Sequence, residues 1–560
     1  MASDKTTPIQ RRLDQLRREG EERSAERLAK DLNYPYLDLT KTAVSLEALR
    51  VLTEERAKEA QAATVTIDGT KVALAVADPK LQATIEILKE LEEKHFKVKV
   101  FVASLSGIKQ AWHLYEFVPD QAKDITGKVD IQKAKFEEFS KKWKNLEEFK
   151  KELENLDIAH TTTTDILEMI LAEALAVDAS DIHFESQEGE IRVRFRIDGL
   201  LHDALPNFPI GSYDKLVSRI KLLSGLKMNV HGEPQDGRFT IELTSKEIEM
   251  RVSIIPSQFG ETIVMRVLNP DAIRVSLAAL GLREDDLKLV EKQLVKPNGL
   301  ILNTGPTGSG KTTTLYAFLQ HLSNPETKII TIEDPIEYRL GGIEQTQVDV
   351  KANYTFAKGL RAIVRQDPDV ILVGEVRDLE TAEIAMQAAL TGHTVLSTLH
   401  TNDAVGSVPR LVDLGVKTAT IGPALNLIIA QRLVRKLCEK CRKQKTPSED
   451  ELKKIKEAIL KISARVDKKP YENFVMYEAV GCVACNGFGY KGRIGIFEFL
   501  ETGPEFEEVI LKEASEVALK RFAVAQGMVT MQQDGILKVL KGITTLEEVE
   551  KVTGAVEFSS

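Results

Sequence analysis

Hydrophobic and polar residues alternate in the first part of the chain in a way that predicts a small α/β unit over residues 1–118. Residues 64–78 (TVTIDGTKVALAVAD) have a period of two on either side of Asp68 and Gly69, which predicts a hairpin. Residues 81–96 have the period of a helix, and residues 97–104 (KVKVFVAS) alternate as a strand does.

A second α/β unit is predicted over residues 161–270. A helical pattern (DILEMILAEALAV) comes first, and alternating stretches such as IRVRFRIDGLLH and EIEMRVSIIPS follow it. Arginines are frequent on these predicted strands, where they commonly lie on a solvated face or in surface ion pairs. They are Arg194, Arg196, Arg238, Arg251 and Arg266.

Residues 119–160 are rich in lysine and glutamate. Aromatic residues recur there at roughly helical spacing, at Phe136, Phe139, Trp143 and Phe149. The pattern favours a charged helical linker with one packing stripe. A helix that docks onto a partner is the alternative.

From residue 275 onward, continuous apolar runs replace the alternating ones. The run GLILN (299–303) predicts a buried strand, and KIITIE, DVILV and TVLST each predict an apolar strand of an α/β domain. Residues 419–430 (ATIGPALNLIIA) are the longest uncharged apolar run considered, and we expect a core helix there. The run is shorter than the roughly 18 residues needed to span a bilayer.

The segment after the first of these strands matches the phosphate-loop pattern G-x-x-x-x-G-K-[ST] in full. A predicted strand precedes it and a predicted helix follows, which is the context that the pattern requires. Converging backbone N–H groups and the helix N-terminus favour bound phosphate, the lysine reaches the β- and γ-phosphates, and the last hydroxyl binds Mg²⁺. The candidate ATP-binding residues are Gly305, Pro306, Thr307, Gly308, Ser309, Gly310, Lys311, Thr312 and Thr313.

Acidic residues and histidines follow the next predicted strands. Glu333 and Asp334 end one strand, and Glu375 follows another, with Gly374 where an aspartate is usual. Carboxylates at the carboxyl ends of parallel strands lie where α/β proteins bind ligands, so Glu375 is a candidate for the Mg²⁺ shell. His393 and His400 flank TVLST and are candidates to sense the γ-phosphate or polarise water, although a single histidine is more often structural.

The four cysteines form two C-x2-C pairs separated by 40 residues, at Cys438, Cys441, Cys482 and Cys485. This arrangement predicts a structural Zn²⁺ site, because four thiolates leave no open position on the metal. Two disulfides or four unrelated thiols are the alternatives, and a cytosolic setting disfavours disulfides. We place the zinc-binding insert at residues 436–496.

Composition narrows the class of protein. The chain has 560 residues, 43% of them hydrophobic and 29% charged, which is ordinary for a globular protein of several domains. Its net charge of −9 argues against nucleic acid as the main partner. The first residues have no apolar stretch typical of a signal peptide, so we expect a cytoplasmic protein.

Four motifs in order carry a resemblance to the secretion ATPase superfamily of type II secretion and type IV pili. They are the phosphate loop, the acidic TIEDPIEY, ILVGEVRD with the glycine that is usual in this family, and TGHTVLSTLHTND. ASDIHFES, FRIDG and PQDGR resemble the family's second N-terminal domain. The resemblance covers about residues 160–555. It implies a RecA-like P-loop ATPase domain (275–560) preceded by a PAS-like α/β domain and a small N-terminal docking domain.

The resemblance also implies roles for residues and partners. Arg251 and Arg266 would contact the γ-phosphate, with Arg238 a further candidate. Glu333 would orient the attacking water and Glu375 would hold Mg²⁺, although either carboxylate is a candidate base. The family forms homo-hexamers at the inner face of the cytoplasmic membrane, associated through an inner-membrane platform protein. Cyclic di-GMP is not predicted as a ligand, because RRLDQLRREG is at most a fragment of the relevant motif.

The leading hypothesis is therefore a hexameric Mg-ATP-hydrolysing machine that assembles type IV pili. The same engine powering a type II secretion pseudopilus is the alternative. A DNA-transfer ATPase and a nucleotide-dependent scaffold with little turnover are further rivals. The acidic net charge and the zinc insert count against the first of these, and the retained carboxylates and arginines count against the second.

Overall fold

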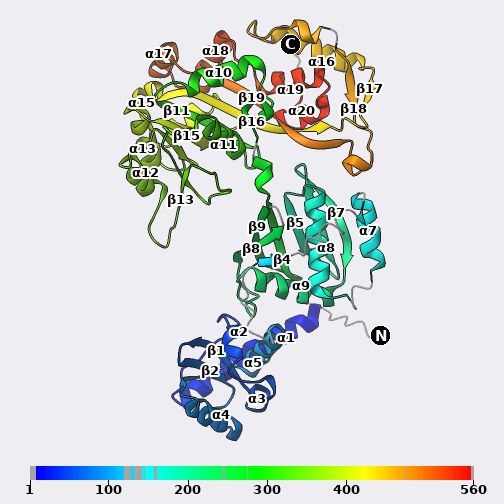
Figure 1. Cartoon of the computed structure of the whole chain (residues 1–560), viewed down its shortest axis with the longest axis vertical. Coiled ribbons are helices and arrows are strands. Elements are labelled where there is room, and N and C mark those ends of the chain that lie inside the picture. The colour runs from blue at the N-terminus through cyan, green and yellow to red at the C-terminus, as the bar shows by residue number, and fades with distance from the viewer. Residues whose placement is uncertain are drawn as a thin grey trace. The chain divides into compact units, whose positions relative to one another are not determined.

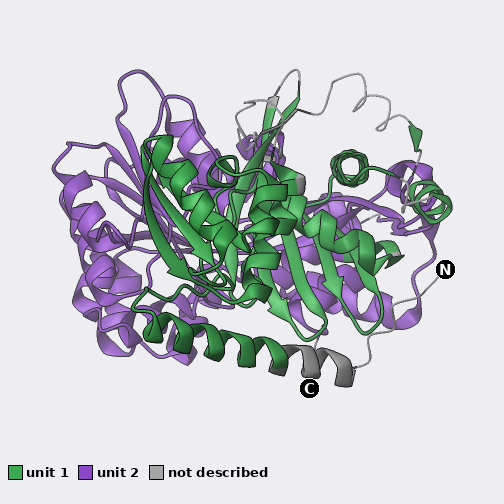
Figure 2. Cartoon of the chain, turned by 90° about the horizontal axis from the view of Figure 1, so that it is seen from below, with its two compact units in different colours: residues 1–143, 148–197, 201–267 green, residues 144–147, 198–200, 268–560 purple. Residues whose placement is uncertain are grey.

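The computed structural model describes residues 8–118, 128–130, 142–143, 145–156, 161–243, 246–273, 275–472 and 474–556. The chain divides into two compact units (Figures 1 and 2). Unit 1 comprises Met1–Trp143, Glu148–Ile197 and Leu201–Val267, and unit 2 comprises Lys144–Glu147, Asp198–Leu200 and Leu268–Ser560. Within the described residues, no helix combines the length and apolarity that a membrane crossing requires.

The first part of unit 1 is built on a three-stranded sheet of order β1-β2-β3. The predicted hairpin is confirmed, since Asp68 pairs with Lys71 and Gly69 takes a positive φ of 58° in the turn. Strands β2 and β3 are parallel, with helix α4 as the crossover between them. The elements are α1 (Pro8–Asp31), α2 (Leu46–Leu49), α3 (Glu54–Glu59), β1 (Ala62–Asp68), β2 (Lys71–Val76), α4 (Gln82–Glu93), β3 (Lys97–Val102), α5 (Leu105–Trp112) and η1 (His113–Phe117).

The second part of unit 1 is a seven-stranded sheet of order β4-β8-β9-β10-β5-β6-β7. In β6 every second residue is buried, and Arg192, Arg194 and Arg196 share the more open face. The elements are β4 (Lys128–Asp130), α7 (Leu146–Asn155), α8 (Thr163–Ala176), β5 (Asp181–Ser186), β6 (Ile191–Ile197), β7 (Leu200–Phe208), α9 (Ile210–Leu223), β8 (Gln235–Leu243), β9 (Lys246–Ser257) and β10 (Gly260–Leu268).

The charged segment 119–160 is only partly described. Phe136 and Phe139 lie outside the described residues. Trp143 and Phe149 are buried, and the ring of Phe149 stacks on Phe195 of β6 at 6.2 Å between centroids. The packing stripe therefore exists at these two positions. The short strand β4, which pairs with β8, was not expected from the charge pattern.

Unit 2 contains a second seven-stranded sheet, of order β13-β12-β14-β15-β11-β16-β19. Its central strands are parallel and buried on both faces, which explains their continuous apolar sequences. One hydrophobic core joins the sheet to α12 and α13, and another joins its opposite face to α10 and α11. The strands are β11 (Gly299–Thr304), β12 (Ile329–Glu333), β13 (Glu344–Gln347), β14 (Val370–Val373), β15 (Thr394–Leu399), β16 (Leu425–Leu437) and β19 (Tyr490–Glu501).

The helices of unit 2 cover the sheet and form its C-terminal part. They are η2 (Pro270–Ile273), η3 (Leu277–Leu280), α10 (Glu284–Leu294), α11 (Lys311–Leu322), α12 (Phe356–Val364), α13 (Leu379–Leu390), α14 (Ser407–Asp413), α15 (Thr418–Ala424), α17 (Pro504–Lys512), α18 (Glu516–Gln526), α19 (Met531–Leu540) and α20 (Leu546–Thr553). A separate insert contains β17 (Lys443–Lys445), α16 (Glu449–Lys461), η4 (Lys469–Tyr471), β18 (Met476–Glu478) and η5 (Val483–Cys485).

The prediction of a core helix over residues 419–430 was wrong for its second half. Helix α15 ends at Ala424, and the 13-residue strand β16 begins at Leu425. This strand pairs with β11 on one side and β19 on the other, so it is buried like a central strand. A short apolar run of that kind cannot be distinguished from a buried helix by periodicity.

Candidate active site

The phosphate loop joins β11 to α11, as the sequence predicts. Three of its glycines, Gly305, Gly308 and Gly310, have positive φ angles of 148°, 79° and 89°. A Cβ atom at Gly305 would lie 2.5 Å from the carbonyl oxygen of Gln431, and one at Gly310 would lie 2.8 Å from its side-chain nitrogen. The loop therefore requires glycine both for its backbone conformation and for its close approach to β16.

Lys311 is the first residue of α11, and its Nζ donates hydrogen bonds to the carbonyl oxygens of Gly305 (2.8 Å) and Pro306 (3.1 Å). Burial lowers the pKa of Lys311, and the carboxylate of Glu375 opposes that shift. The hydroxyl of Ser309 is buried without a hydrogen-bond partner among the described residues. A cation over the loop, an unpaired buried hydroxyl and a helix N-terminus fit a bound polyphosphate. Thr312, half-buried one residue further along, occupies the hydroxyl position that the loop pattern reserves for Mg²⁺.

Gln431 on β16 forms hydrogen bonds with residues on both sides of the phosphate loop. Its Oε1 accepts hydrogen bonds from Asn303 Nδ2 (3.1 Å) and Thr314 Oγ1 (2.8 Å), which lie just before and just after the loop. Gln431 is 128 residues from Asn303 in the chain, so no local pattern identified it. Gln431 therefore connects the two ends of the loop through one side-chain oxygen.

Glu333, at the end of β12, is buried and held by three donors. The hydroxyl of Tyr316 donates to Oε2, while Thr331 Oγ1 (2.7 Å) and Gln345 Nε2 (3.2 Å) donate to Oε1. Burial raises the pKa of Glu333, and these hydrogen bonds oppose the shift because they stabilise the charged form. A carboxylate with a raised pKa and a fixed orientation has the properties of a general base.

Glu375 lies two residues beyond the end of the neighbouring strand β14 and is more accessible than Glu333. Arg377 donates to its Oε1, and Nε2 of His400 lies 3.3 Å from its Oε2. Arg377 also lies 3.6 Å from Oδ2 of Asp334. Sequence reasoning missed Arg377, although its position two residues after Glu375 was visible in ILVGEVRD.

Gly374, in the place of the usual aspartate, is explained by packing. A Cβ atom there would lie 3.2 Å from the carbonyl oxygen of Ile332 and 3.3 Å from the Cα atom of Glu333. Both contacts are with backbone, which cannot give way as a side chain does. The glycine thus lets the end of β14 approach Glu333 closely.

The two candidate histidines lie at opposite ends of β15. His400 follows the carboxyl end of the strand and reaches Glu375. His393 precedes the strand, and its Nδ1 lies 3.0 Å from the carbonyl oxygen of Ala388. The structure therefore brings His400, but not His393, to the edge of the sheet that holds the carboxylates.

The candidate arginines belong to unit 1, whereas the phosphate loop belongs to unit 2. Nε of Arg266 lies 3.2 Å from Oδ1 of Asp181, and Asp181 also pairs with Arg196 at 3.3 Å. Arg238 and Arg251 are directly opposite each other on β8 and β9. The contact of these arginines with a nucleotide stays a prediction.

The four cysteines converge at the end of β16. The Sγ–Sγ distances are 3.9 Å for Cys438–Cys482, 3.8 Å for Cys441–Cys485 and 3.7 Å for Cys482–Cys485, and all four atoms lie within 4.8 Å of one another. A tetrahedral ion with Zn–S bonds of about 2.3 Å separates its ligands by about 3.8 Å. A disulfide needs an S–S distance of about 2.05 Å, so these pairs are not disulfides.

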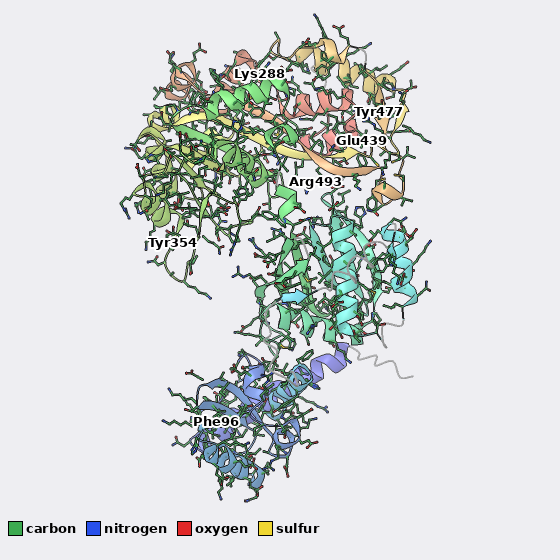
Figure 3. The ribbon with its side chains drawn as sticks, viewed as in Figure 1. Phe96, Lys288, Tyr354, Glu439, Tyr477 and Arg493 are labelled. Atoms are coloured by element: carbon green, nitrogen blue, oxygen red, sulfur yellow. The ribbon has the colours of Figure 1, made fainter. Side chains whose placement is uncertain are left out.

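Backbone geometry shapes the turn that carries the second cysteine pair. Backbone N–H groups of Cys482 (3.2 Å) and Gly489 (3.3 Å) donate to Sγ of Cys485. Burial alone would raise the pKa of Cys485, but these hydrogen bonds outweigh it and lower the pKa to about 7, which favours the thiolate. A Cβ atom at Gly481 would lie 2.3 Å from the carbonyl oxygen of Gly487. Figure 3 labels two residues of the insert, Glu439 and Tyr477. The guanidinium carbon of Arg442 lies 4.6 Å from the centroid of the Tyr477 ring.

Comparison with known proteins decides the family. The model of the type II/IV secretion system protein family matches residues 158–551. The chain belongs to that family. An MshEN domain model matches residues 32–121.

Curated relatives of the secretion family resemble most of this chain. The type IV pilus assembly ATPase PilB of Myxococcus xanthus is 38% identical over 526 residues, which are 93% of this chain and 89% of that protein. The type II secretion system protein E of Pseudomonas aeruginosa is 46% identical over 389 residues, 69% of this chain and 75% of that protein. This chain is accordingly an ATPase of the secretion and pilus class.

A solved structure has a similar fold. The X-ray structure of the Legionella pneumophila ATPase DotB is similar with a TM-score of 0.50 and 23% identity, over 70% of this chain and 96% of that one. The predicted fold class, an α/β P-loop ATPase with a four-cysteine cluster, is confirmed.

Proposed function

We propose that this chain is a Mg-ATP-hydrolysing motor that works as a homo-hexamer and drives type IV pilus assembly from the cytoplasmic face of the inner membrane. The observation that supports the choice of pilus is the reach of one pilus relative into the N-terminal region of this chain. The pilus assembly ATPase of Myxococcus xanthus is similar over 93% of this chain, whereas the type II secretion protein of Pseudomonas aeruginosa is similar over 69%. The first reaches into the N-terminal region that a docking domain would occupy.

The chemistry proposed for the site is supported by the geometry of its carboxylates and by the family resemblance. Lys311 would turn from the carbonyl oxygens of its own loop toward the β- and γ-phosphates. Thr312 and Glu375 would hold Mg²⁺, which would neutralise charge on the phosphates. Glu333, oriented by its three donors, positions the attacking water and accepts its proton. Arg251 and Arg266 supply positive charge as the terminal phosphate leaves, with Arg238 in support.

The N-terminal region would dock onto an inner-membrane platform protein, and nucleotide-driven movement of the ATPase domain would be passed to that partner. Zn²⁺ bound by the four cysteines would hold the insert together and take no part in hydrolysis. His393 is proposed only as a support of β15, since it lies at the end of the strand away from Glu375. The type II secretion motor remains the alternative function.

A bacterial strain that lacks the gene for this protein tests the choice between pilus assembly and type II secretion. It is complemented with the wild type, with Lys311→Ala, or with Lys288→Ala as a matched control on the exposed face of α10. Wild type and Lys288→Ala should restore pilin to the sheared surface fraction, and Lys311→Ala should not. Restoration of proteins in the culture supernatant, with pilin unchanged, would instead assign the motor to type II secretion. Light scattering of the purified chain with and without nucleotide tests the hexamer.

A further inference from the structure

Arg377 links the ends of two neighbouring strands at the active site. Strands β12 and β14 are parallel and in register at Ile332 and Val373, so they end at the same edge of the sheet. Asp334 follows the first strand and Glu375 lies just beyond the second. The guanidinium of Arg377 pairs with Oε1 of Glu375 and lies 3.6 Å from Oδ2 of Asp334.

The two active-site glutamates are held in different ways. Glu333 is fixed by neutral donors, from Tyr316, Thr331 and Gln345, and its side chain is buried. Glu375 is held by cationic or potentially cationic side chains, Arg377 at Oε1 and His400 at Oε2. Each oxygen of Glu375 therefore lies against one of these two side chains, and a metal ion would have to displace one of them.

Arg377 is the partner that can move. Its side chain is 60% exposed, against 15% for Glu375, so water can replace the carboxylate when the guanidinium swings outward. A partly exposed ion pair of this kind is weak. A divalent cation carries twice the charge of a guanidinium, so it would compete effectively for the carboxylate of Glu375.

We propose that Arg377 is a positioning residue that holds Glu375 at the edge of the sheet and competes with Mg²⁺ for its carboxylate. The inference rests on the proposed role of Glu375 in the Mg²⁺ shell. In the resting site, Arg377 supplies the positive charge that keeps Asp334 and Glu375 together. When Mg-nucleotide binds, the guanidinium of Arg377 leaves Oε1 of Glu375 but stays near Asp334. The carboxylate of Glu375 is then already oriented for Mg²⁺.

Competition between Arg377 and Mg²⁺ for Glu375 predicts the direction in which the Mg²⁺ affinity changes. Removing the guanidinium removes a competitor, so Mg²⁺ should bind more tightly. It also removes the link to Asp334, so Glu375 should be less well oriented and turnover should fall. A residue that only supported the fold would weaken Mg²⁺ binding or leave it unchanged. Lysine can restore charge but cannot bridge two carboxylates with a planar fork.

The test titrates MgCl₂ into the full-length chain with a fluorescent ADP analogue and reads nucleotide binding. Arg377→Gln should lower the half-saturating Mg²⁺ concentration about two- to five-fold, the worth of a partly exposed ion pair. Its kcat should fall with the KM for ATP little changed, and Arg377→Lys should recover the Mg²⁺ response of the wild type but only part of its kcat. Arg361→Gln, which removes an exposed pair with Glu380 on α13, is the matched control.

Two further outcomes separate the proposals. If Glu375→Gln raises the half-saturating Mg²⁺ concentration while Arg377→Gln leaves it unchanged or raises it too, the competition is refuted and the role of Glu375 stands. If Glu375→Gln has no effect on the Mg²⁺ titration, the role of Glu375 itself is wrong, and the inference about Arg377 falls with it.

Discussion

The hydroxyl of Tyr316, on the helix that follows the phosphate loop, donates a hydrogen bond to the carboxylate of Glu333 at the end of the next strand. The phosphate-binding helix and the candidate base are thus joined directly. A shift of α11 on nucleotide binding would be felt at Glu333 through this one contact.

Removing the hydroxyl should therefore alter the base without altering the phosphate loop. In Tyr316→Phe, one of the hydrogen bonds that favour the charged form of Glu333 is lost, so its pKa should rise further above the usual range. If Glu333 is the base, it acts only when deprotonated, and the acidic limb of the kcat–pH profile should move to higher pH. ATP affinity should stay within about two-fold, since the loop contacts are intact.

The matched control is Tyr354→Phe, which removes a hydroxyl that donates to Thr346 at 3.2 Å in the same unit (Figure 3). Its pH profile should coincide with that of the wild type. An unshifted acidic limb in Tyr316→Phe would assign the base elsewhere, with Glu375 the next candidate.

Cys482→Ser should remove the metal and loosen the insert. One zinc per chain is expected in the wild type by elemental analysis, and well under half of that in the variant, because a serine hydroxyl is a poor replacement for a thiolate. The melting temperature should fall by several degrees or more, since structural zinc contributes to folding. Val483→Ala, a change at an exposed neighbour, should retain the metal. A wild-type zinc content near zero would end the zinc hypothesis.

Arg266→Ala should leave ATP binding largely intact and slow hydrolysis by at least about ten-fold, in line with arginines that act on the transition state. Arg192→Ala is the control, because Arg192 lies in the same sheet and pairs with Asp203 instead. Single-turnover rates measured beside equilibrium binding separate the two effects. Equal hydrolysis by both variants would contradict the role proposed for Arg266.

The buried carboxyl of Glu498 on β19 should make the stability of the folded chain depend on pH. Burial raises its pKa from an ordinary 4.5 to about 7, against the opposing hydrogen bonds from the backbone N–H groups of Ala404 and Met531. Between those two values the folded chain retains a proton that the unfolded chain releases. The stabilisation is therefore present at low pH and is lost as the pH rises toward 7.

Glu498→Gln removes the titrating group, so its melting temperature should fall less between pH 5 and pH 8 than that of the wild type. Glu508→Gln changes an exposed carboxylate (74% exposed side chain) and should follow the wild type. The relevant comparison is the difference in melting temperature across the pH series, measured in one buffer system. Parallel curves for all three proteins would show that Glu498 is charged throughout.

The sequence predicted those parts of the site that local patterns encode. The phosphate loop, the carboxylates after β12 and β14, and the cysteine pairs each require particular residue types at short spacing, so they could be located before the structure. Gln431 and Tyr316 could not, because their partners are brought together across the sheet. The continuous apolar run at residues 419–430 was ambiguous for a related reason: burial on all sides removes the periodicity that distinguishes helix from strand.

Strand β16 has a mechanical consequence for the ATPase. It passes beside the phosphate loop at Gln431 and ends at Leu437, directly before the first cysteine of the four-cysteine cluster. Its 13 residues extend over roughly 40 Å, so one strand connects the phosphate loop with the cysteine cluster. Without a metal ion at the cysteine cluster, a movement at Gln431 would not be transmitted along β16 to the insert. A metal-free chain should then still hydrolyse ATP while its pilin assembly fails, and loss of both activities together would contradict this.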